Sequence, residues 1–510
     1  MARPTLFPVN PPNLAAPILA RRTEGGAAPA LIADDVALSY RDLAQRVESL
    51  AETLRAAGLE PEEPVLVPVS NRPEDLEAFL GVWIAGGVVV PVHRASPVAV
   101  VREHLDATGA RLVAAMGRPI VAGAGWQETG NLLVARHGAP PPRAVLGGAA
   151  LVIFTSGSTG RPKGVVLSHR ALAGKLAAID SLLHFERGES TLLVLNITFS
   201  FGIWVSLLTL TTGGSLLMHE KFAPRAFCEA LAAGHVARTA VVPTMMRALF
   251  ADPPAALDAA RGSERFRQML IGGESLGRAL AAEIAARFPR AGLVDIYGLT
   301  ETATSDFFLL PEDHARFAGC IGRPSPQVEY RIAGADGAAA AAGEPGELQI
   351  RTPFIMNGYL DAPELTDVAF QDGWFRTGDI ARQRDSGVVE LAGRAKEQIS
   401  RGGIKISPLE LEQVFAAHPD VAAAMAAGAA DPILGERIHL LVVPRPGRVL
   451  VEEALRAHAA SRLPKFRQPD AYHIADALPL GRTGKADRGA LKAMIESGKL
   501  AGAIRPHPSN

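Results

Sequence analysis

Along the first 320 residues, short apolar runs alternate with longer stretches whose apolar positions recur at helical spacing. Near-continuous apolar runs predict buried strands, and spacings of three and four predict amphipathic helices. Strands are predicted at 65–70, 88–92, 111–116, 150–156, 191–197, 215–220, 239–243, 268–273 and 293–298, and helices at 41–58, 74–87 and 98–110. This alternation is typical of parallel sheets with helices on both faces, whose ligands bind at the carboxyl ends of the strands.

The pattern changes after about residue 320. Shorter β segments at 328–334, 346–352 and 388–393 are separated by turns containing Gly and Pro, and small units of helices and strands follow from about residue 395. We therefore predict an α/β chain with a large N-terminal domain, residues 1–394, whose parallel-rich sheets are covered by helices and accompanied by a β-rich subdomain. Residues 395–510 are predicted to form a small α+β C-terminal domain.

Residues 191–218 carry no charged side chain, and this stretch is long enough to cross a bilayer. However, Asn196, several Thr and Ser residues and the neighbours Gly213 and Gly214 interrupt it, whereas a spanning helix is more continuously apolar. We predict a buried strand, helix and strand here, and no membrane span.

Charge and cysteine content narrow the classes of function. The 510 residues include 52 Lys and Arg against 53 Asp and Glu, which gives a net charge of −1. A nucleic-acid binder usually shows a strong basic excess, so no nucleic-acid partner is expected. Cys228 and Cys320 provide neither a Cys-based zinc motif nor a disulfide framework. Because prolines interrupt the N-terminal residues where a signal peptide needs a continuous apolar run, we expect a cytoplasmic protein.

The segment FTSGSTGRPKGVVLSH, residues 154–169, places small and hydroxylated residues directly after a predicted strand. Glycines permit close approach of the backbone, and hydroxyl and N–H groups can donate hydrogen bonds to phosphate oxygens. Lys163 adds a positive charge, although the GxxxxGK[ST] spacing of a Walker A loop is absent. This composition predicts a phosphate-binding loop rather than a flexible turn.

The loop and four further motifs, in the same order along the chain, resemble the adenylate-forming superfamily of acyl-CoA synthetases, stand-alone adenylation domains and firefly-type luciferases. The further motifs are YGLTET (297–302), GWFRTGDIA (373–381), GRAKEQISRGGIKISPLELE (393–412) and PLGRTGKADR (479–488). The resemblance implies two half-reactions. A carboxylate first attacks the α-phosphate of ATP, giving acyl-AMP and pyrophosphate, and a thiol then attacks the acyl carbonyl and releases AMP.

Matching the motifs position by position implies a set of nucleotide contacts. The residues that would hold the β- and γ-phosphates are Thr155, Ser156, Gly157, Ser158, Thr159, Gly160 and Lys163. The remaining nucleotide-site residues are Gly272, Gly273, Glu274, Asp295, Tyr297 and Gly298, with Tyr297 stacked on adenine, and Asp379 and Arg394 at the ribose. Thr300 would contact the α-phosphate. Glu301 would ligate Mg²⁺, which prefers hard oxygen donors and would arrive with ATP.

The resemblance also assigns roles in the C-terminal domain. Lys485 matches the mobile catalytic lysine of the family, which would neutralise charge as the carboxylate meets the α-phosphate. The family rotates this domain between the half-reactions, and the match puts the hinge at Lys396. Gly402 and Gly403 would then lie beside a tunnel for the pantetheine thiol, where glycines let the thiol pass close to the backbone.

Two departures from the family pattern concern the acid. Ser200 stands where amino-acid-activating domains carry an Asp for the substrate ammonium, so α-amino acids are not expected. Phe199 stands where many acyl- and aryl-CoA ligases have a gating His. We predict an apolar pocket for an aromatic or a short to medium acid, with plain core packing as the alternative for each residue. The candidates are Phe199, Ser200, Phe201, Trp204, Met245, Met246 and Leu249.

The first interpretation is an AMP-forming carboxylate–CoA ligase that uses ATP, Mg²⁺ and coenzyme A. The alternative is a stand-alone adenylation enzyme that loads the phosphopantetheine of a carrier protein, and both remain open because both use a pantetheine thiol. The basic cluster Arg462, Lys465 and Arg467 could meet CoA phosphates or lie on a solvated surface. A monomer or a homodimer is expected. A catalytically silent nucleotide binder is not favoured, because Glu301, Asp379 and Lys485 are all present.

Overall fold

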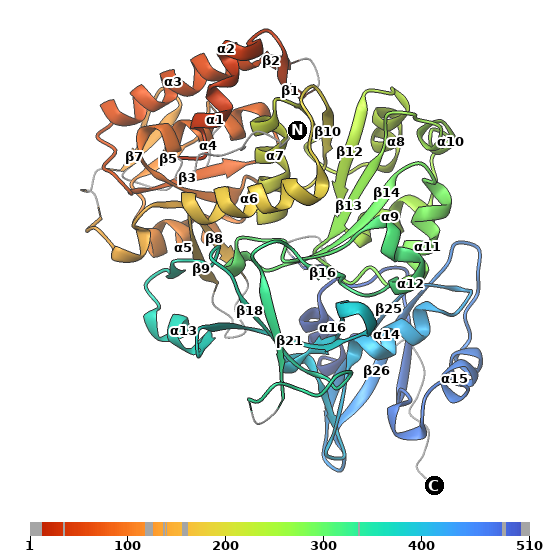
Figure 1. The fold of residues 1–510 in the computed structure, drawn as a ribbon. Helices are drawn as coiled ribbons and strands as arrows, with labels where there is room; N and C mark the ends of the chain where they lie inside the picture. Colours follow the sequence, from red (N-terminus) through yellow and green to blue (C-terminus); the bar gives the residue numbers. More distant parts are fainter. Residues whose placement is uncertain are drawn as a thin grey trace.

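A nine-stranded sheet forms one half of the N-terminal domain in a computed structural model (Figure 1). The structure describes residues 13–33, 36–117, 126–135, 138, 140–155, 162–334, 337–481 and 486–500. The strand order is β16-β15-β14-β13-β12-β10-β11-β1-β2. The strands are β1 (Pro29–Ala33), β2 (Val36–Ser39), β10 (Ser190–Leu193), β11 (Ser215–Met218), β12 (Val236–Val241), β13 (Gln268–Gly272), β14 (Gly292–Tyr297), β15 (Phe307–Leu309) and β16 (Arg323–Pro324). From β1 to β14 along this order, neighbouring strands pair in parallel.

An eight-stranded sheet forms the other half, with the order β19-β9-β8-β4-β3-β5-β7-β6. Its strands are β3 (Pro64–Val69), β4 (Val88–His93), β5 (Leu112–Ala114), β6 (Trp126–Thr129), β7 (Leu132–Ala135), β8 (Ala149–Thr155), β9 (Lys163–Ser168) and β19 (Gly358–Tyr359). The inner strands β5, β3, β4 and β8 are parallel, and their side chains are almost entirely buried. The predicted parallel sheets are therefore confirmed.

Helices fill the space between the two large sheets and cover their outer faces (Figure 1). α6 packs on β9, α7 packs on β10 and β11, and the two helices contact each other; α4 contacts β3, β4 and β1. The helices of this domain are α1 (Ala16–Leu19), α2 (Arg21–Gly25), α3 (Tyr40–Ala56), α4 (Pro73–Ala85), α5 (Val98–Thr108), α6 (His169–Leu183), α7 (Ser200–Thr212), α8 (Pro224–Ala232), α9 (Pro243–Ala251), α10 (Leu257–Arg261) and α11 (Arg278–Arg287).

Local sequence explains where these helices begin and end. Ser39 and Asp42 form a capping box at the start of α3, and Gly58 follows the helix with a φ of 80°. The strand, helix and strand predicted within residues 191–218 are confirmed as β10, α7 and β11. Almost every side chain of α7 is buried, which explains why the segment carries no charge. Among the described residues, no helix is long and apolar enough to cross a membrane.

A smaller sheet leads from the N-terminal sheets to the C-terminal region. Its strands are β17 (Glu329–Ala333), β18 (Gly346–Arg351), β20 (Phe370–Gln371), β21 (Trp374–Gln383) and β22 (Val389–Arg394), all antiparallel. Short helices accompany this region: η2 (Thr300–Thr302), η3 (Pro311–Asp313), α12 (His314–Phe317) and α13 (Pro363–Val368). This is the predicted β-rich subdomain.

Beyond η5 (Ala395–Glu397), the chain builds a separate sheet with its own core, drawn in blue in Figure 1. The strands are β23 (Ile399–Arg401), β24 (Ile404–Ile406), β25 (Val421–Asp431), β26 (Gly435–Pro444) and β27 (Ala471–Ile474), and the helices are α14 (Pro408–Ala416), α15 (Glu452–Ala460) and α16 (Arg488–Glu496). Its main core cluster contains only residues from Ile399 onward. The change of sheet thus falls where the sequence pattern changes.

Candidate active site

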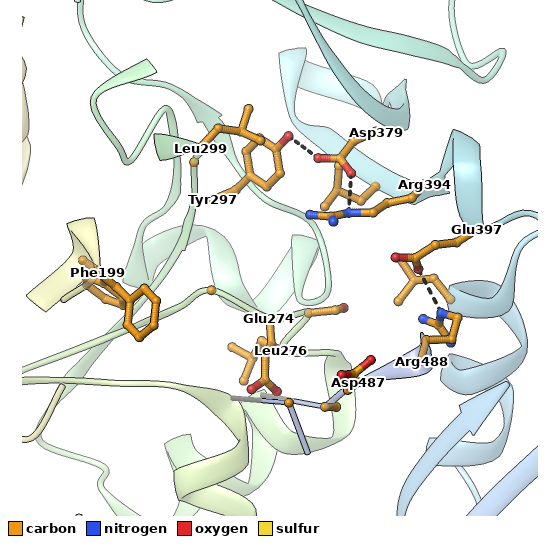
Figure 2. Close-up of a pocket in the computed structure, with 18 of the residues that line it drawn as sticks. Phe199, Glu274, Leu276, Tyr297, Leu299, Asp379, Arg394, Glu397, Asp487 and Arg488 are labelled. Atoms are coloured by element: carbon orange, nitrogen blue, oxygen red, sulfur yellow. Dashed lines mark hydrogen bonds and ion pairs between the residues drawn. The ribbon is translucent and has the colours of Figure 1, made fainter. Parts of the chain in front are cut away.

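A cavity of about 1570 Å³ lies at the carboxyl ends of β13 and β14 and reaches the C-terminal region. Figure 2 shows residues of three origins around it: Tyr297 from β14, Asp379 and Arg394 from the β-rich sheet, and Arg488 from the start of α16. This position agrees with the rule that parallel sheets bind ligands at the carboxyl ends of their strands.

Tyr297, Asp379 and Arg394 form a linked group on one side of the cavity (Figure 2). The Tyr297 hydroxyl donates to Asp379 Oδ2 at 2.6 Å, and Arg394 Nε donates to Asp379 Oδ1 at 3.0 Å. β21 and β22 pair so that Asp379 stands directly opposite Arg394, which explains how residues from two separate motifs meet. Burial raises the pKa of Asp379, and the facing guanidinium opposes that rise. The structure thus brings together the residues predicted at the adenine and ribose.

Asp295 lines the cavity from within β14, two residues before Tyr297. Its burial raises its pKa to about 8, opposed only by a hydrogen bond from the Ile296 N–H. Gly272 does not line the cavity; a Cβ built on it would lie 2.5 Å from the Ile296 carbonyl oxygen. Glycine is therefore needed there for the close approach of β13 and β14. Gly298 does line the cavity, and a Cβ on it would lie 2.1 Å from the Ser305 nitrogen.

Gly273 and Glu274 follow β13 into the cavity. Both oxygens of Glu274 accept from the Thr244 hydroxyl, at 2.7 and 2.8 Å, and Arg247 Nη1 lies 3.3 Å from Oε2. Thr244 and Arg247 belong to α9, so the Glu274 carboxylate is directed towards that helix. The Glu274 carboxylate therefore faces the positive charge of Arg247 at the cavity wall.

Thr300 and Glu301 sit in η2 and line the cavity. The turn that follows holds three non-glycine residues in the left-handed region, Ala303, Thr304 and Ser305, with φ of 55°, 78° and 45°. Such backbone is disfavoured, and the surrounding structure must hold it in place.

Asp306, which ends this turn, is completely buried and anchors it. Its Oδ1 lies 2.7 Å from Lys175 Nζ of α6, and its Oδ2 accepts from the Thr302 hydroxyl. The Lys175 and Asp306 side chains are both 0% exposed. This ion pair ties the turn that carries Thr300 and Glu301 to the helix layer between the sheets.

The phosphate-binding loop is described only at its edges. Ser156, Gly157, Ser158, Thr159 and Gly160 lie outside the described residues. Thr155 ends β8 and Lys163 begins β9, and these two residues pair across the antiparallel strands at the cavity wall. The Lys163 ammonium lies 4.9 Å from the centre of the Tyr359 ring.

Part of the predicted acid pocket lines the cavity and part does not. Phe199, Ser200 and Phe201 line it at the start of α7. Trp204 does not; it is 1% exposed and lies in the core, stacked on Phe201 with ring centres 5.5 Å apart. The methionines Met245 and Met246 also pack against core clusters rather than lining the cavity, and Leu249 is fully buried. We therefore assign these four residues to the core behind the cavity, because α7 and α9 turn those positions inward.

Of the residues predicted to act from the C-terminal domain, some lie at the cavity and others lie away from it. Lys485 lies outside the described residues, but Gly481 and Ala486, which flank its loop, line the cavity. Lys396 lines it too. By contrast, Gly402 and Gly403 form the turn between β23 and β24, with φ of 57° and 81°, and do not line the cavity.

Several residues that line the cavity were not predicted from the sequence. Arg488 Nε donates to Glu397 at 2.9 Å, and Nη1 contacts Glu412, so this guanidinium joins the start of α16 to η5 and α14 (Figure 2). Tyr359 comes from the two-residue strand β19. His104 stacks on Phe154 with ring centres 4.1 Å apart at the acid side. Only the position of Arg488 within the PLGRTGKADR motif could have indicated its role.

A magnesium ion that arrives with ATP needs few oxygen donors from the protein. No cluster of three or more His, Cys, Asp or Glu side chains suited to a metal occurs in the described part of the chain. Glu301 supplies one carboxylate, whose Oε1 accepts from Tyr359 while Oε2 accepts nothing from the described residues. A single carboxylate fits a magnesium ion whose other ligands are phosphate oxygens and water.

Comparison with known proteins identifies the family. The model described as AMP-binding enzyme matches residues 20–360, and the model described as AMP-binding enzyme C-terminal domain matches residues 410–485. The chain belongs to the AMP-binding enzymes, and its resemblance to the adenylate-forming superfamily is confirmed.

Named relatives and solved structures agree with this family. The feruloyl-CoA synthase of Amycolatopsis sp is 32% identical over 466 residues, covering 89% of this chain and 94% of the relative. The sulfoacetate–CoA ligase of Cupriavidus necator is 32% identical over 504 residues, covering 93% and 96%. The crystal structure of ATP-bound MatB from Rhodopseudomonas palustris shares the fold, with a TM-score of 0.82, 24% identity and coverage of 95% and 99%. The amide bond synthetase McbA from Marinactinospora thermotolerans gives a TM-score of 0.79, 25% identity and coverage of 94% and 99%.

Proposed function

We propose that this chain is an ATP-dependent carboxylate–CoA ligase that activates an acid as acyl-AMP and transfers the acyl group to the thiol of coenzyme A. The observation that carries the proposal is the cavity wall, where Tyr297, Asp379 and Arg394 are hydrogen-bonded together opposite the acid-side residues. Relatives named feruloyl-CoA synthase, sulfoacetate–CoA ligase and indoleacetate–CoA ligase support the same reaction class.

In the first half-reaction, the described residues bind and orient the nucleotide. Tyr297 offers a ring face to adenine, and its hydroxyl is fixed by Asp379. Asp379 would exchange part of its present hydrogen bonding for the ribose hydroxyls, and Arg394 would keep it charged. Thr300 would donate to the α-phosphate. These groups are fixed before the substrate arrives, which lowers the reorganisation needed at the reacting centre.

Two anions must meet in this step, so positive charge is required at the α-phosphate. A magnesium ion bound with ATP would supply part of it by neutralising phosphate charge, and Glu301 would hold that ion. Lys485 would contact both the incoming carboxylate and the α-phosphate. Its neighbours Gly481 and Ala486 at the cavity support this assignment.

For the second half-reaction, we propose that the C-terminal domain turns about Lys396 to bring Gly402 and Gly403 to the cavity. Residues 395–510 would then act as one unit. The turn that carries the two glycines is held by Arg401, whose Nη2 lies 2.6 Å from Asp470 Oδ1. That ion pair lies within the C-terminal region and would move with it. The carrier-protein alternative differs from this proposal in the acceptor of the acyl group, which would be the phosphopantetheine thiol of a carrier protein instead of coenzyme A.

The acid is proposed to be aromatic or of short to medium length. The acid side of the cavity is lined by apolar rings and chains, Phe154, Phe199, Phe201, Phe250 and Leu276. Apolar walls favour acids without a charged substituent, because burial of an unpaired charge is unfavourable. Ser200 offers no carboxylate to a substrate ammonium. A cytoplasmic location and a monomeric or homodimeric state stay predictions of the sequence.

The test combines purified protein, ATP, magnesium, coenzyme A and a pooled acid library, with products identified by mass spectrometry. The pool contains aromatic, short, medium, long and dicarboxylic acids, with α-amino acids as a control group. We expect one class of acid to appear as its acyl-CoA. Accumulation of acyl-AMP alone would contradict the CoA acceptor and favour the carrier-protein alternative.

A matched pair of variants tests the mechanism. Lys485→Ala should abolish most acid-dependent pyrophosphate release, whereas Lys492→Ala should not, because Lys492 lies on α16 in an exposed ion pair with Glu436. Undiminished pyrophosphate release by Lys485→Ala would refute the proposed role of this lysine.

A further inference from the structure

Tyr359 is joined to Glu301 through both the side chain and the backbone of the short segment that contains it. Its hydroxyl donates to Glu301 Oε1 at 2.9 Å, and the Met356 N–H donates to the Glu301 carbonyl oxygen at 2.7 Å. The tyrosine lines the cavity although it is only 6% exposed. The position of Glu301 therefore depends on a strand distant in sequence.

The same segment is joined to the strand that begins at Lys163. β19 pairs antiparallel with β9, with Tyr359 opposite Val165, and the Leu360 N–H donates to the Gly164 carbonyl oxygen at 2.7 Å. The Lys163 ammonium lies 4.9 Å from the centre of the Tyr359 ring, within the range of a cation–π interaction. One aromatic side chain thus contacts both a cation and an anion of the cavity wall.

The hydroxyl can act only as a donor towards the carboxylate. A phenol has an ordinary pKa of about 10 and is therefore protonated at neutral pH, so it donates to the carboxylate oxygen 2.9 Å away. A carboxylate oxygen engaged by this proton is oriented, and Oε2 accepts nothing from the described residues. The hydrogen bond therefore selects which oxygen of Glu301 is presented to the cavity.

We propose that Tyr359 is a positioning residue that holds the Glu301 carboxylate and the Lys163 ammonium in one arrangement for metal-bound triphosphate. The inference rests on the proposed function, since that function makes Glu301 the carboxylate for magnesium. Orientation of a ligating carboxylate by a hydrogen-bonded neighbour commonly changes metal affinity by an order of magnitude or more. Tyr359 itself need not touch the reacting atoms.

The test measures nucleotide binding without any acid, so that no turnover occurs. ATP is titrated into the full-length protein by calorimetry, once with magnesium and once with EDTA. Tyr359→Phe removes only the hydroxyl. We expect its ATP affinity to fall about tenfold or more with magnesium and less than about twofold in EDTA, because the hydroxyl orients the carboxylate that holds the metal.

Two further variants separate the contributions. Tyr359→Leu also removes the ring under Lys163 and should weaken ATP binding in EDTA as well. Tyr330→Phe is the matched control, because the Tyr330 hydroxyl makes only a 3.4 Å contact with the Gly387 carbonyl oxygen away from the cavity. Its ATP affinity should equal that of the wild type in both buffers.

The outcomes are distinct. The inference is overturned if Tyr359→Phe binds ATP as the wild type does with magnesium, if it loses affinity equally in both buffers, or if magnesium gives the wild type no gain in affinity. Failure of the acyl-CoA assay with intact ATP binding would instead overturn the proposed function and leave this measurement meaningful.

Discussion

Replacing Lys175 with methionine should destabilise the folded protein more than any single surface change. The Lys175–Asp306 pair is 0% exposed on both sides, with Nζ and Oδ1 2.7 Å apart. Methionine keeps much of the chain length beside Phe354, which lies 5.3 Å from the ammonium, but leaves Asp306 without its counter-charge. Removal of one partner from a buried pair lowers the free energy of unfolding by about 3–5 kcal/mol.

The assay is urea denaturation followed by tryptophan fluorescence, because Trp83 and Trp204 are each 1% exposed within the core that contacts α6. Lys492→Met is the control, since its ion pair with Glu436 is 47% and 23% exposed. Exposed pairs contribute about 0–1 kcal/mol. The double variant Lys175→Met with Asp306→Asn should recover more than half of the loss, because no buried charge then remains.

The loss should also depend on pH in a defined direction. Burial raises the pKa of Asp306, and Lys175 opposes this rise. Without the lysine, the folded pKa rises further above the unfolded value near 3.9. A raised folded pKa gives a contribution that is complete below the unfolded pKa and is lost as pH increases. The defect of Lys175→Met should therefore be larger at pH 8 than at pH 5. A loss below about 1 kcal/mol, or one equal to that of Lys492→Met, would refute the reasoning.

Four further variants test the cavity and the core behind it. Burial raises the pKa of Asp295 to about 8, so the stability contributed by its protonated form is lost as pH rises from about 4 to about 8. Asp295→Asn should remove this pH dependence from the urea midpoint. Parallel curves of urea midpoint against pH for the variant and the wild type would contradict this expectation. Asp379→Asn removes the charge that faces Arg394 and should weaken ATP binding about tenfold by calorimetry, whereas unchanged affinity would exclude a ribose contact. Trp204→Ala should lower the free energy of unfolding by about 3–5 kcal/mol. Phe199→Ala should instead shift acid preference towards larger acids with little loss of stability, and the reverse pattern would contradict the assigned positions.

The sequence predicted those parts of the fold in which one local pattern decides the outcome. The helix at 41–58 was recognisable because its apolar positions recur at helical spacing and Gly58 marks its end, and α3 spans Tyr40–Ala56. The Asp379–Arg394 group was predictable because each residue lies in a recognisable motif, although their pairing across β21 and β22 was not visible.

Other features depend on contacts between distant segments and had no sequence signal. α7 is apolar on all sides, so its periodicity could not separate Phe201 at the cavity from Trp204 in the core. Lys175 reads as an ordinary helix-surface lysine until Asp306 is placed beside it. Tyr359 reaches Glu301 only because the two-residue strand β19 pairs with β9.

The order of strands in the nine-stranded sheet has a consequence for synthesis of the chain on the ribosome. β1 and β2 emerge early, but β11, the strand that pairs with β1, begins only at residue 215, and the sheet ends with β16 at residue 324. During that interval, the uncharged α7 emerges before β12, β13 and β14 are available to complete the sheet beside it. Non-local pairing of this kind is slow, and exposed apolar segments favour aggregation. We therefore expect the nascent chain to depend most on chaperones while residues 101–300 leave the exit tunnel.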